Sequence, residues 1–365
     1  MSCAPLDTER EIAPANCSAL TDDFRRTVAV RQQECMGGGT NSGCRNLRFQ
    51  LAAILSFVHH SSKLLHFGSG QITWTGPFVA TLSLLQSRMG LYGAVGEIGV
   101  HHGMFAIAVA HQARHGEHIL AADLFDALQN LNVDHSGSGD LRRFLRNMGR
   151  FGIRRDDMDL RVGLSSSLPL PYAHPLRLFS VDGGHTEAIT AGDIAWAACH
   201  AVEGGIIILD DWPNPGWPGV KLGAARNWRC GARRLTPFAE MQNKLYLTTS
   251  RAAAEHYQAE LGKMPFWAAR LAAGKGKKGW VHAHSVLRLN DASPTTAPSA
   301  LTRLWHRTVL QQANLSSSSE RRTPAAVPRW TTRLQAESLI AKWKPERWPF
   351  RWTQNWLLDL LGNMP

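Results

Sequence analysis

Hydrophobic residues in the middle of the chain form short unbroken runs that alternate with longer segments of helical spacing. The unbroken runs predict seven strands, near residues 93–98, 118–122, 158–163, 176–181, 205–209, 243–248 and 280–289. The helical spacing predicts helices at 46–65, 77–89, 102–115, 138–150, 187–202 and 251–262. Strands without polar alternation suit a parallel sheet that is covered on both faces. The pattern therefore predicts an α/β fold with a doubly wound, mostly parallel sheet of seven strands.

The chain changes character at both ends, which divides it into three parts. Residues 1–46 are polar and predict an N-terminal arm, and residues 47–290 form the predicted domain with its N-terminal helices. Residues 291–365 hold ten Lys+Arg, five Asp+Glu and a run of Trp residues, between Ser/Thr/Pro-rich stretches that predict partial disorder. One interpretation of this extension is a segment that binds a membrane interface or a partner. The other is an arm that packs its Trp residues on the domain or stays unattached, and this is favoured because Pro345 and Pro349 interrupt a long helix.

Charge and composition narrow the function only slightly. The formal net charge is +11, which permits binding to nucleic acid or an anionic membrane, but no usual nucleic-acid motif is present. The first 23 residues lack the apolar core of a secretory signal, and no apolar run reaches membrane-spanning length, so we expect a cytoplasmic protein. The sequence leaves open whether the chain forms a homo-oligomer.

Acidic residues follow two of the predicted strands directly. Asp182 ends one apolar run, and Asp210 and Asp211 end the next. Ligands of open α/β sheets bind beyond the carboxyl ends of the strands, so we expect these side chains to meet at one edge. Crowded carboxylates need a cation, protons or a polar ligand to be tolerated, and hard oxygen ligands suit Mg²⁺ or a similar divalent cation.

A glycine-containing loop joins the first predicted strand to a helix. Gly99 and Gly103 let a ligand approach the backbone closely, and the following helix offers free N–H groups to an anion. The dinucleotide fingerprint Gly-x-Gly-x-x-Gly is absent, which disfavours a dinucleotide. Asp123 ends the second predicted strand, where a carboxylate can accept hydrogen bonds from ribose hydroxyls.

Four segments in this order resemble one family, the class I S-adenosylmethionine-dependent methyltransferases. The similarity is greatest to the catechol-type and macrocin O-methyltransferase subgroup, which includes cephalosporin-hydroxylase-like proteins. The resemblance covers about residues 70–290 and implies a Rossmann-like fold. It is carried by residues 97–103 (EIGVHHG), 132–140 (NVDHSGSGD), 181–186 (VDGGHT) and 209–219 (LDDWPNPGWPG).

The resemblance assigns a role to each candidate residue. It implies an enzyme that moves a methyl group from S-adenosylmethionine to a hydroxyl of a small, sugar-like or hydroxylated acceptor, with Mg²⁺ bound. The implied cofactor-binding residues are Glu97, Gly99, His101, Gly103, Asp123, Leu164, Ser165 and Asp182. The implied metal ligands are Asp182, Asp210 and Asp211. Two positions depart from the family: Phe105 replaces a small hydroxyl residue, and Gly184 replaces a bulky aromatic residue.

His185 is the candidate catalytic base. It follows Asp182 by three residues, so both side chains can face one pocket, and an imidazole titrates near neutral pH, at about 6.5. The alternative is that His185 caps the following helix or orients Asp182.

Two other functions compete with the methyltransferase. The main alternative is a catalytically inactive binding or scaffold protein that retains the fold, which Phe105 and the basic extension would suit. An oxidative or hydrolytic metal enzyme is disfavoured because no His-rich iron triad is present.

Overall fold

The structure is a computed structural model that describes residues 72–114, 116–230, 235–264, 267, 278–281 and 284–289. The predicted helix at 46–65, the N-terminal arm and the C-terminal extension lie outside these residues. The proposed division of the chain into three parts therefore remains a prediction. Within the described residues, no helix has both the length and the apolar character needed to cross a membrane.

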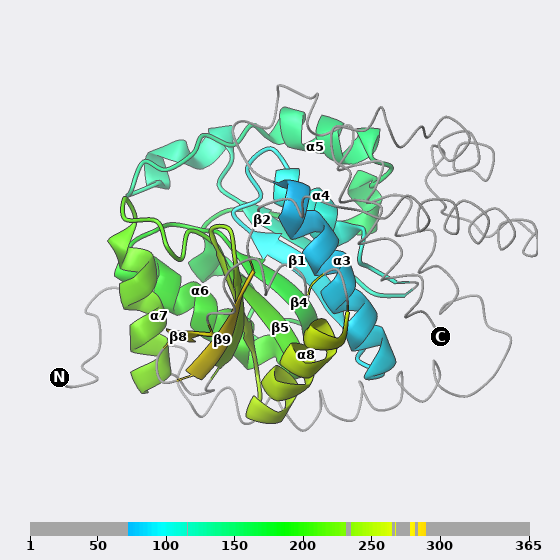
Figure 1. The fold of residues 1–365 in the computed structure, drawn as a ribbon. Helices are drawn as coiled ribbons and strands as arrows, with labels where there is room; N and C mark the ends of the chain where they lie inside the picture. The colour runs from blue at the N-terminus through cyan, green and yellow to red at the C-terminus, as the bar shows by residue number, and fades with distance from the viewer. Residues whose placement is uncertain are drawn as a thin grey trace, which may run out of the picture.

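The described core is an α/β fold built on one mixed sheet, as predicted (Figure 1). The strand order is β3-β2-β1-β4-β5-β7-β6-β9-β8. The first five strands in this order (β3, β2, β1, β4 and β5) run parallel to one another, and β7 is antiparallel to both of its neighbours. The strands are β1 (Ala94–Ile98), β2 (Ile119–Asp123), β3 (Met158–Val162), β4 (Leu176–Val181), β5 (Ala201–Leu209), β6 (Thr236–Met241), β7 (Lys244–Thr248), β8 (Lys278–Val281) and β9 (His284–Leu289).

The strand count differs from the predicted seven for two local reasons. The sequence pattern does not predict β6, because Pro237 and Glu240 interrupt its short apolar run, yet this strand lies between β7 and β9. The predicted strand at 280–289 is a hairpin of two antiparallel strands, β8 and β9. Both differences fall at one side of the sheet and leave the order of the strands that carry the candidate residues unchanged.

Helices cover both faces of the sheet, as Figure 1 shows. One core contains side chains of α3, α4, α5 and α8, and the opposite core contains those of α6 and α7. The helical spacing does not predict α7, and α3 begins at Ile72 instead of residue 77. The bounds are α3 (Ile72–Arg88), α4 (Met104–Ala110), α5 (Leu141–Arg150), α6 (Glu187–His200), α7 (Pro218–Cys230) and α8 (Arg251–Lys263).

The register of the central strands brings the candidate residues to one edge. Val181 on β4 pairs with Ile98 on β1 and with Leu209 on β5. The residues that follow these strands therefore leave the sheet at the same level, where the chain order reverses between β1 and β4. This is the position at which open α/β sheets bind ligands.

A buried ion pair stabilises the opposite end of β4. The Arg177 side chain is fully buried and donates to both carboxylate oxygens of Glu117, at 2.7 and 2.8 Å. It also donates to Gln86 Oε1 on α3 at 2.8 Å. Burial alone would raise the pKa of Glu117, but the charge and hydrogen bonds of Arg177 hold that pKa below its usual value. The charge of Arg177 is thus paired by Glu117, and the hydrogen bond from Arg177 to Gln86 joins β4 to α3.

Candidate active site

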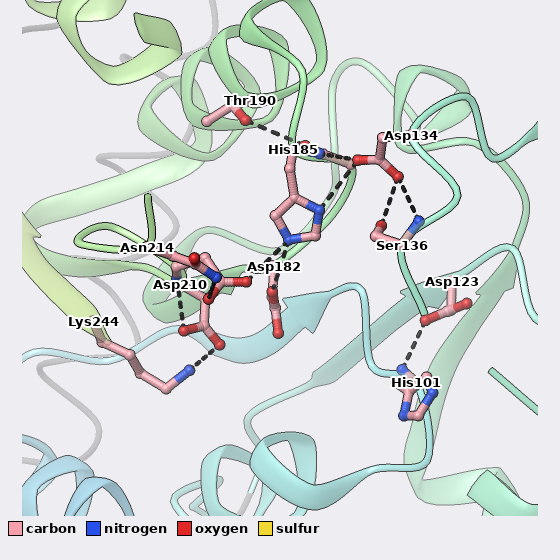
Figure 2. Close-up of polar contacts among 12 residues, drawn as sticks. His101, Asp123, Asp134, Ser136, Asp182, His185, Thr190, Asp210, Asn214 and Lys244 are labelled. Carbon is pink, nitrogen blue, oxygen red and sulfur yellow. Dashed lines mark hydrogen bonds and ion pairs between the residues drawn. The ribbon is translucent and has the colours of Figure 1, made fainter. Parts of the chain in front are cut away.

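A cavity of about 1240 Å³ opens at the carboxyl ends of the central strands. Its walls include the loop after β1, the end of β2, the loop after β3 and the acidic ends of β4 and β5. All of the cofactor and metal residues predicted from the sequence, except Gly103, line this one cavity. Figure 2 shows the side chains that converge on it.

The loop after β1 is held close to the loop after β4 by glycine. Gly99 has φ +83°, and a Cβ at this position would lie 1.7 Å from the carbonyl oxygen of Asp182. Gly103, with φ +92°, leads into α4. No other residue type accommodates the first of these positions, because any side chain would collide with backbone. The loop therefore needs glycine to pack against the β4 end.

Glu97 is a buried acid with an unsatisfied oxygen. It lies within β1, its exposed fraction is 2%, and its Oε1 atom has no hydrogen-bond partner among the described residues. Burial raises the pKa of Glu97 to about 8, although the Lys244 ammonium opposes this rise. The unpartnered Oε1 atom of this buried carboxyl can accept a hydrogen bond from a cationic ligand group.

Asp123 orders the loop that faces it. Its Oδ2 accepts a hydrogen bond from the His101 backbone N–H at 2.7 Å, and its Oδ1 accepts one from the Phe125 N–H at 2.7 Å. His101 has a positive φ of 47°, which this contact helps to hold. Leu164 and Ser165 line the cavity in the loop that follows β3. These residues thus face the same cavity as the loop of Gly99, from its β2 and β3 side.

Three side chains at the ends of β4 and β5 converge closely enough to hold a metal ion. Asp182, His185 and Asp211 each offer one atom, and these atoms all lie within 4.8 Å of one another. His185 Nε2 lies 3.2 Å from Asp211 Oδ2 and 3.9 Å from Asp182 Oδ1. Burial, and then the charge of Asp210, raise the pKa of Asp182 well above its ordinary value. The crowding of negative charge expected from the sequence is present.

Asp210 is not a member of this group. Its carboxylate forms a buried ion pair with Lys244, the first residue of β7 (Figure 2). The Lys244 ammonium also lies 4.0 Å from the centroid of the Phe105 ring. Phe105, which departs from the family pattern, thus packs against a buried cation. The sequence gives no sign of this role for Lys244, which stands there as an isolated Lys in an apolar strand without a recognisable motif.

His185 is held on two sides. Its Nδ1 lies 3.1 Å from Asp134 Oδ2, and its backbone N–H donates to the same oxygen. The Trp217 ring stacks on the imidazole, with centroids 4.4 Å apart and planes 19° apart. Burial disfavours the charged ring, but hydrogen bonding and charge from Asp211 and Asp134 outweigh this and raise the pKa of His185. Thr186, not His185, caps α6, since its side chain accepts the Ile189 N–H.

One family model is similar to the central part of the chain. The model of a family described as a methyltransferase domain matches residues 97–212. No curated protein matches the chain.

Several solved structures are similar to this chain, all of them distantly. The O-methyltransferase NovP is 14% identical, with 48% of this chain and 80% of that chain covered and a TM-score of 0.40. TomG from Streptomyces achromogenes, an O-methyltransferase solved in complex with SAM, is 15% identical over 54% and 90% of the two chains, with a TM-score of 0.37. A putative O-methyltransferase from Klebsiella pneumoniae is 16% identical over 62% and 100%, with a TM-score of 0.39. Scores this low carry no inference about the present chain.

The family match falls on the segment that holds both halves of the cavity, from Glu97 in β1 to Trp212 after β5. Residues 97–212 are thus similar to a methyltransferase domain, in agreement with the resemblance to class I S-adenosylmethionine-dependent methyltransferases.

Proposed function

We propose that this protein transfers a methyl group from S-adenosylmethionine to a hydroxyl oxygen of a small, sugar-like or otherwise hydroxylated acceptor, with a divalent cation bound beside the acceptor. One observation carries the proposal: a single cavity joins the loop of Gly99 to the cluster of Asp182, His185 and Asp211. Donor and acceptor can therefore meet without a large movement of the fold.

The residues of the cofactor half suit S-adenosylmethionine. The unsatisfied Oε1 of Glu97 is a partner for the ammonium of its methionine part, and Asp123 is a partner for the ribose hydroxyls. Leu164 and Ser165 are assigned to the adenine side. Bound S-adenosylmethionine supplies a methyl group on a sulfonium, which the acceptor oxygen takes as the S–C bond breaks.

The residues of the acceptor half suit a divalent cation. Asp182 and Asp211 supply hard oxygen atoms. Burial first, and then the negative charge of Asp210, raise the pKa of Asp182, and a bound cation would favour its ionised form. The family resemblance assigns Asp210 to the metal as well, but its ion pair with Lys244 supports a role as counter-ion instead. A bound Mg²⁺ would lower the pKa of a hydroxyl that it contacts and would orient it.

His185 is the proposed general base. His185 lines the cavity and its Nε2 lies 3.2 Å from Asp211 Oδ2, so we assign to this atom the hydroxyl proton that is released as the new O–C bond forms. The ring is fixed by Asp134 and Trp217, which would spare the reaction the cost of orienting it.

Calorimetry with S-adenosylmethionine and S-adenosylhomocysteine, followed by methyl transfer to a panel of hydroxylated compounds, tests the proposal. We expect micromolar binding of both, of the order usual for enzyme ligands, and transfer that depends on Mg²⁺. Absence of binding to a folded protein would refute the proposal. Binding without transfer to any acceptor would favour the inactive scaffold instead, and full activity in EDTA would refute only the metal part.

A further inference from the structure

We infer that Asp134 is a positioning residue that fixes the orientation of His185. This inference rests on the proposed function, since it concerns the proposed base. Asp134 lies in the loop between β2 and α5, 51 residues before His185 in the chain, and its Oδ2 accepts from both the Nδ1 and the backbone N–H of His185. One carboxylate oxygen thus holds the imidazole ring and the main chain that carries it.

Asp134 is itself held rigidly. Its Oδ1 accepts hydrogen bonds from the backbone N–H of Ser136 at 3.0 Å and from the Ser136 hydroxyl at 2.6 Å. Its side chain is only 8% exposed, and that of His185 is 10% exposed. The two oxygens of the carboxylate therefore bind different groups, because Oδ1 anchors the acid to its own loop while Oδ2 anchors the histidine.

These contacts decide which ring nitrogen points toward Asp211 and Asp182. An ionised carboxylate only accepts hydrogen bonds, so Nδ1 must be the donor in the contact with Asp134. The opposite ring atom, Nε2, then lies 3.2 Å from Asp211 Oδ2 and 3.9 Å from Asp182 Oδ1. Asp134 thereby sets the orientation of the ring and holds Nε2 at the ends of β4 and β5, where the proposed reaction takes place.

The loop of Asp134 also contacts the cofactor half of the cavity. A Cβ on Gly137 would lie 3.4 Å from the His101 side chain, and one on Gly139 would lie 3.1 Å from Asp123 Oδ1. The same short segment therefore packs against the proposed ribose carboxylate and holds the proposed base. Figure 2 shows Asp134 between Ser136 and His185, on the side of the site away from Lys244.

The first experiment separates positioning from folding. Asp134→Asn keeps the size of the side chain but has only one acceptor oxygen, so it cannot hold both Ser136 and His185 as the carboxylate does. We expect kcat to fall by about 100-fold or more, since a positioned base contributes roughly 10²–10⁴-fold, while the KM of the acceptor and the Kd of S-adenosylmethionine stay within about twofold. The matched control is Asp157→Asn, which removes an acid from the surface pair with Arg154 and should leave kcat unchanged.

The second experiment needs no acceptor, so it remains decisive if the proposed activity fails. In protein labelled with ¹⁵N-histidine, the signals of His185 are identified by their loss in His185→Gln. We expect Nδ1 of the native protein to carry a proton that is hydrogen-bonded to Asp134, and the Nδ1 signal to shift in Asp134→Asn. A native ring without a proton on Nδ1, or an Nδ1 signal unaffected by Asp134→Asn, would overturn the inference. A normal kcat in Asp134→Asn would do the same.

Discussion

Lys244 holds Asp210 in an ion pair that is almost completely buried beneath the cavity, with side-chain exposures of 5% and 9%. Two further acids, Glu97 and Asp182, lie close enough for the same ammonium to oppose the rise in the pKa of each. One lysine from the antiparallel strand β7 thus compensates much of the negative charge that the parallel strands bring together. This relationship leads to the first prediction.

Lys244→Met should destabilise the protein strongly. Loss of one partner leaves an uncompensated buried charge, which costs about 3–5 kcal/mol of the free energy of unfolding. Urea denaturation followed by circular dichroism measures this loss. The control is Lys263→Met, which breaks an exposed pair with Glu260 and should change the free energy by less than about 1 kcal/mol. Equal effects of the two substitutions would contradict a compensating role for Lys244.

Asp211→Asn should weaken binding of a divalent cation more than Asp210→Asn does. Asp211 belongs to the converging group, whereas Asp210 already has Lys244 as its partner. Loss of a ligand should cost at least the roughly 10–100-fold that loss of an outer partner costs. Electron paramagnetic resonance of free Mn²⁺ measures the affinity of each variant directly. A greater loss in Asp210→Asn would restore the ligand set predicted from the sequence.

Asp123→Ala should lower the affinity for S-adenosylmethionine without abolishing folding. A hydrogen bond to a charged group contributes about 1.5–3 kcal/mol, so the Kd should rise by roughly 10- to 150-fold. Calorimetry measures the change, and Asp126→Ala in the adjacent turn is the matched control. If both variants bind equally well, Asp123 does not hold the ribose.

The pair of Glu117 and Arg177 should make stability depend on pH in the acid range. The folded-state pKa of Glu117 lies below its unfolded value, so its contribution is complete above the unfolded pKa of about 4.3 and is lost as the pH falls through the folded pKa. Glu117→Gln leaves Arg177 buried and unpaired and should cost about 3–5 kcal/mol near pH 7. Denaturation at about pH 7 and about pH 3.5 should show that the difference from the native protein shrinks in acid. A constant difference would contradict the linkage.

The sequence predicts the centre of this fold better than its margin. Strands such as β4 and β5 are largely buried, so their apolar runs are distinctive and their acidic ends follow at once. Strand β6 and helix α7 escape prediction because Pro237 interrupts the first and the second begins within a Gly- and Pro-rich stretch. Packing against neighbouring strands, more than local pattern, decides elements of this kind.

Some residues of the candidate site can be predicted from the sequence, and others cannot. Glu97, Asp123 and Asp182 can be found from the sequence because each stands near the carboxyl end of a strand, where it lines the cavity. The roles of Lys244 and Asp134 escape it because they depend on long-range contacts, with Asp210 and with His185. For Asp134 a local signal exists, since this acid precedes a serine by two positions within the distinctive segment 132–140.

The close contact between Gly99 and the backbone of Asp182 has a consequence for how such a protein can change. Main chain meets main chain there, so the spacing between the loop after β1 and the loop after β4 does not depend on any side chain. Other parts of the cavity wall are formed by loops that carry Val133 and Trp217. Under the proposed function, substitutions in those loops would alter which acceptor is recognised while the separation of the reacting groups is preserved. Acceptor choice and reaction geometry would thus be separately adjustable.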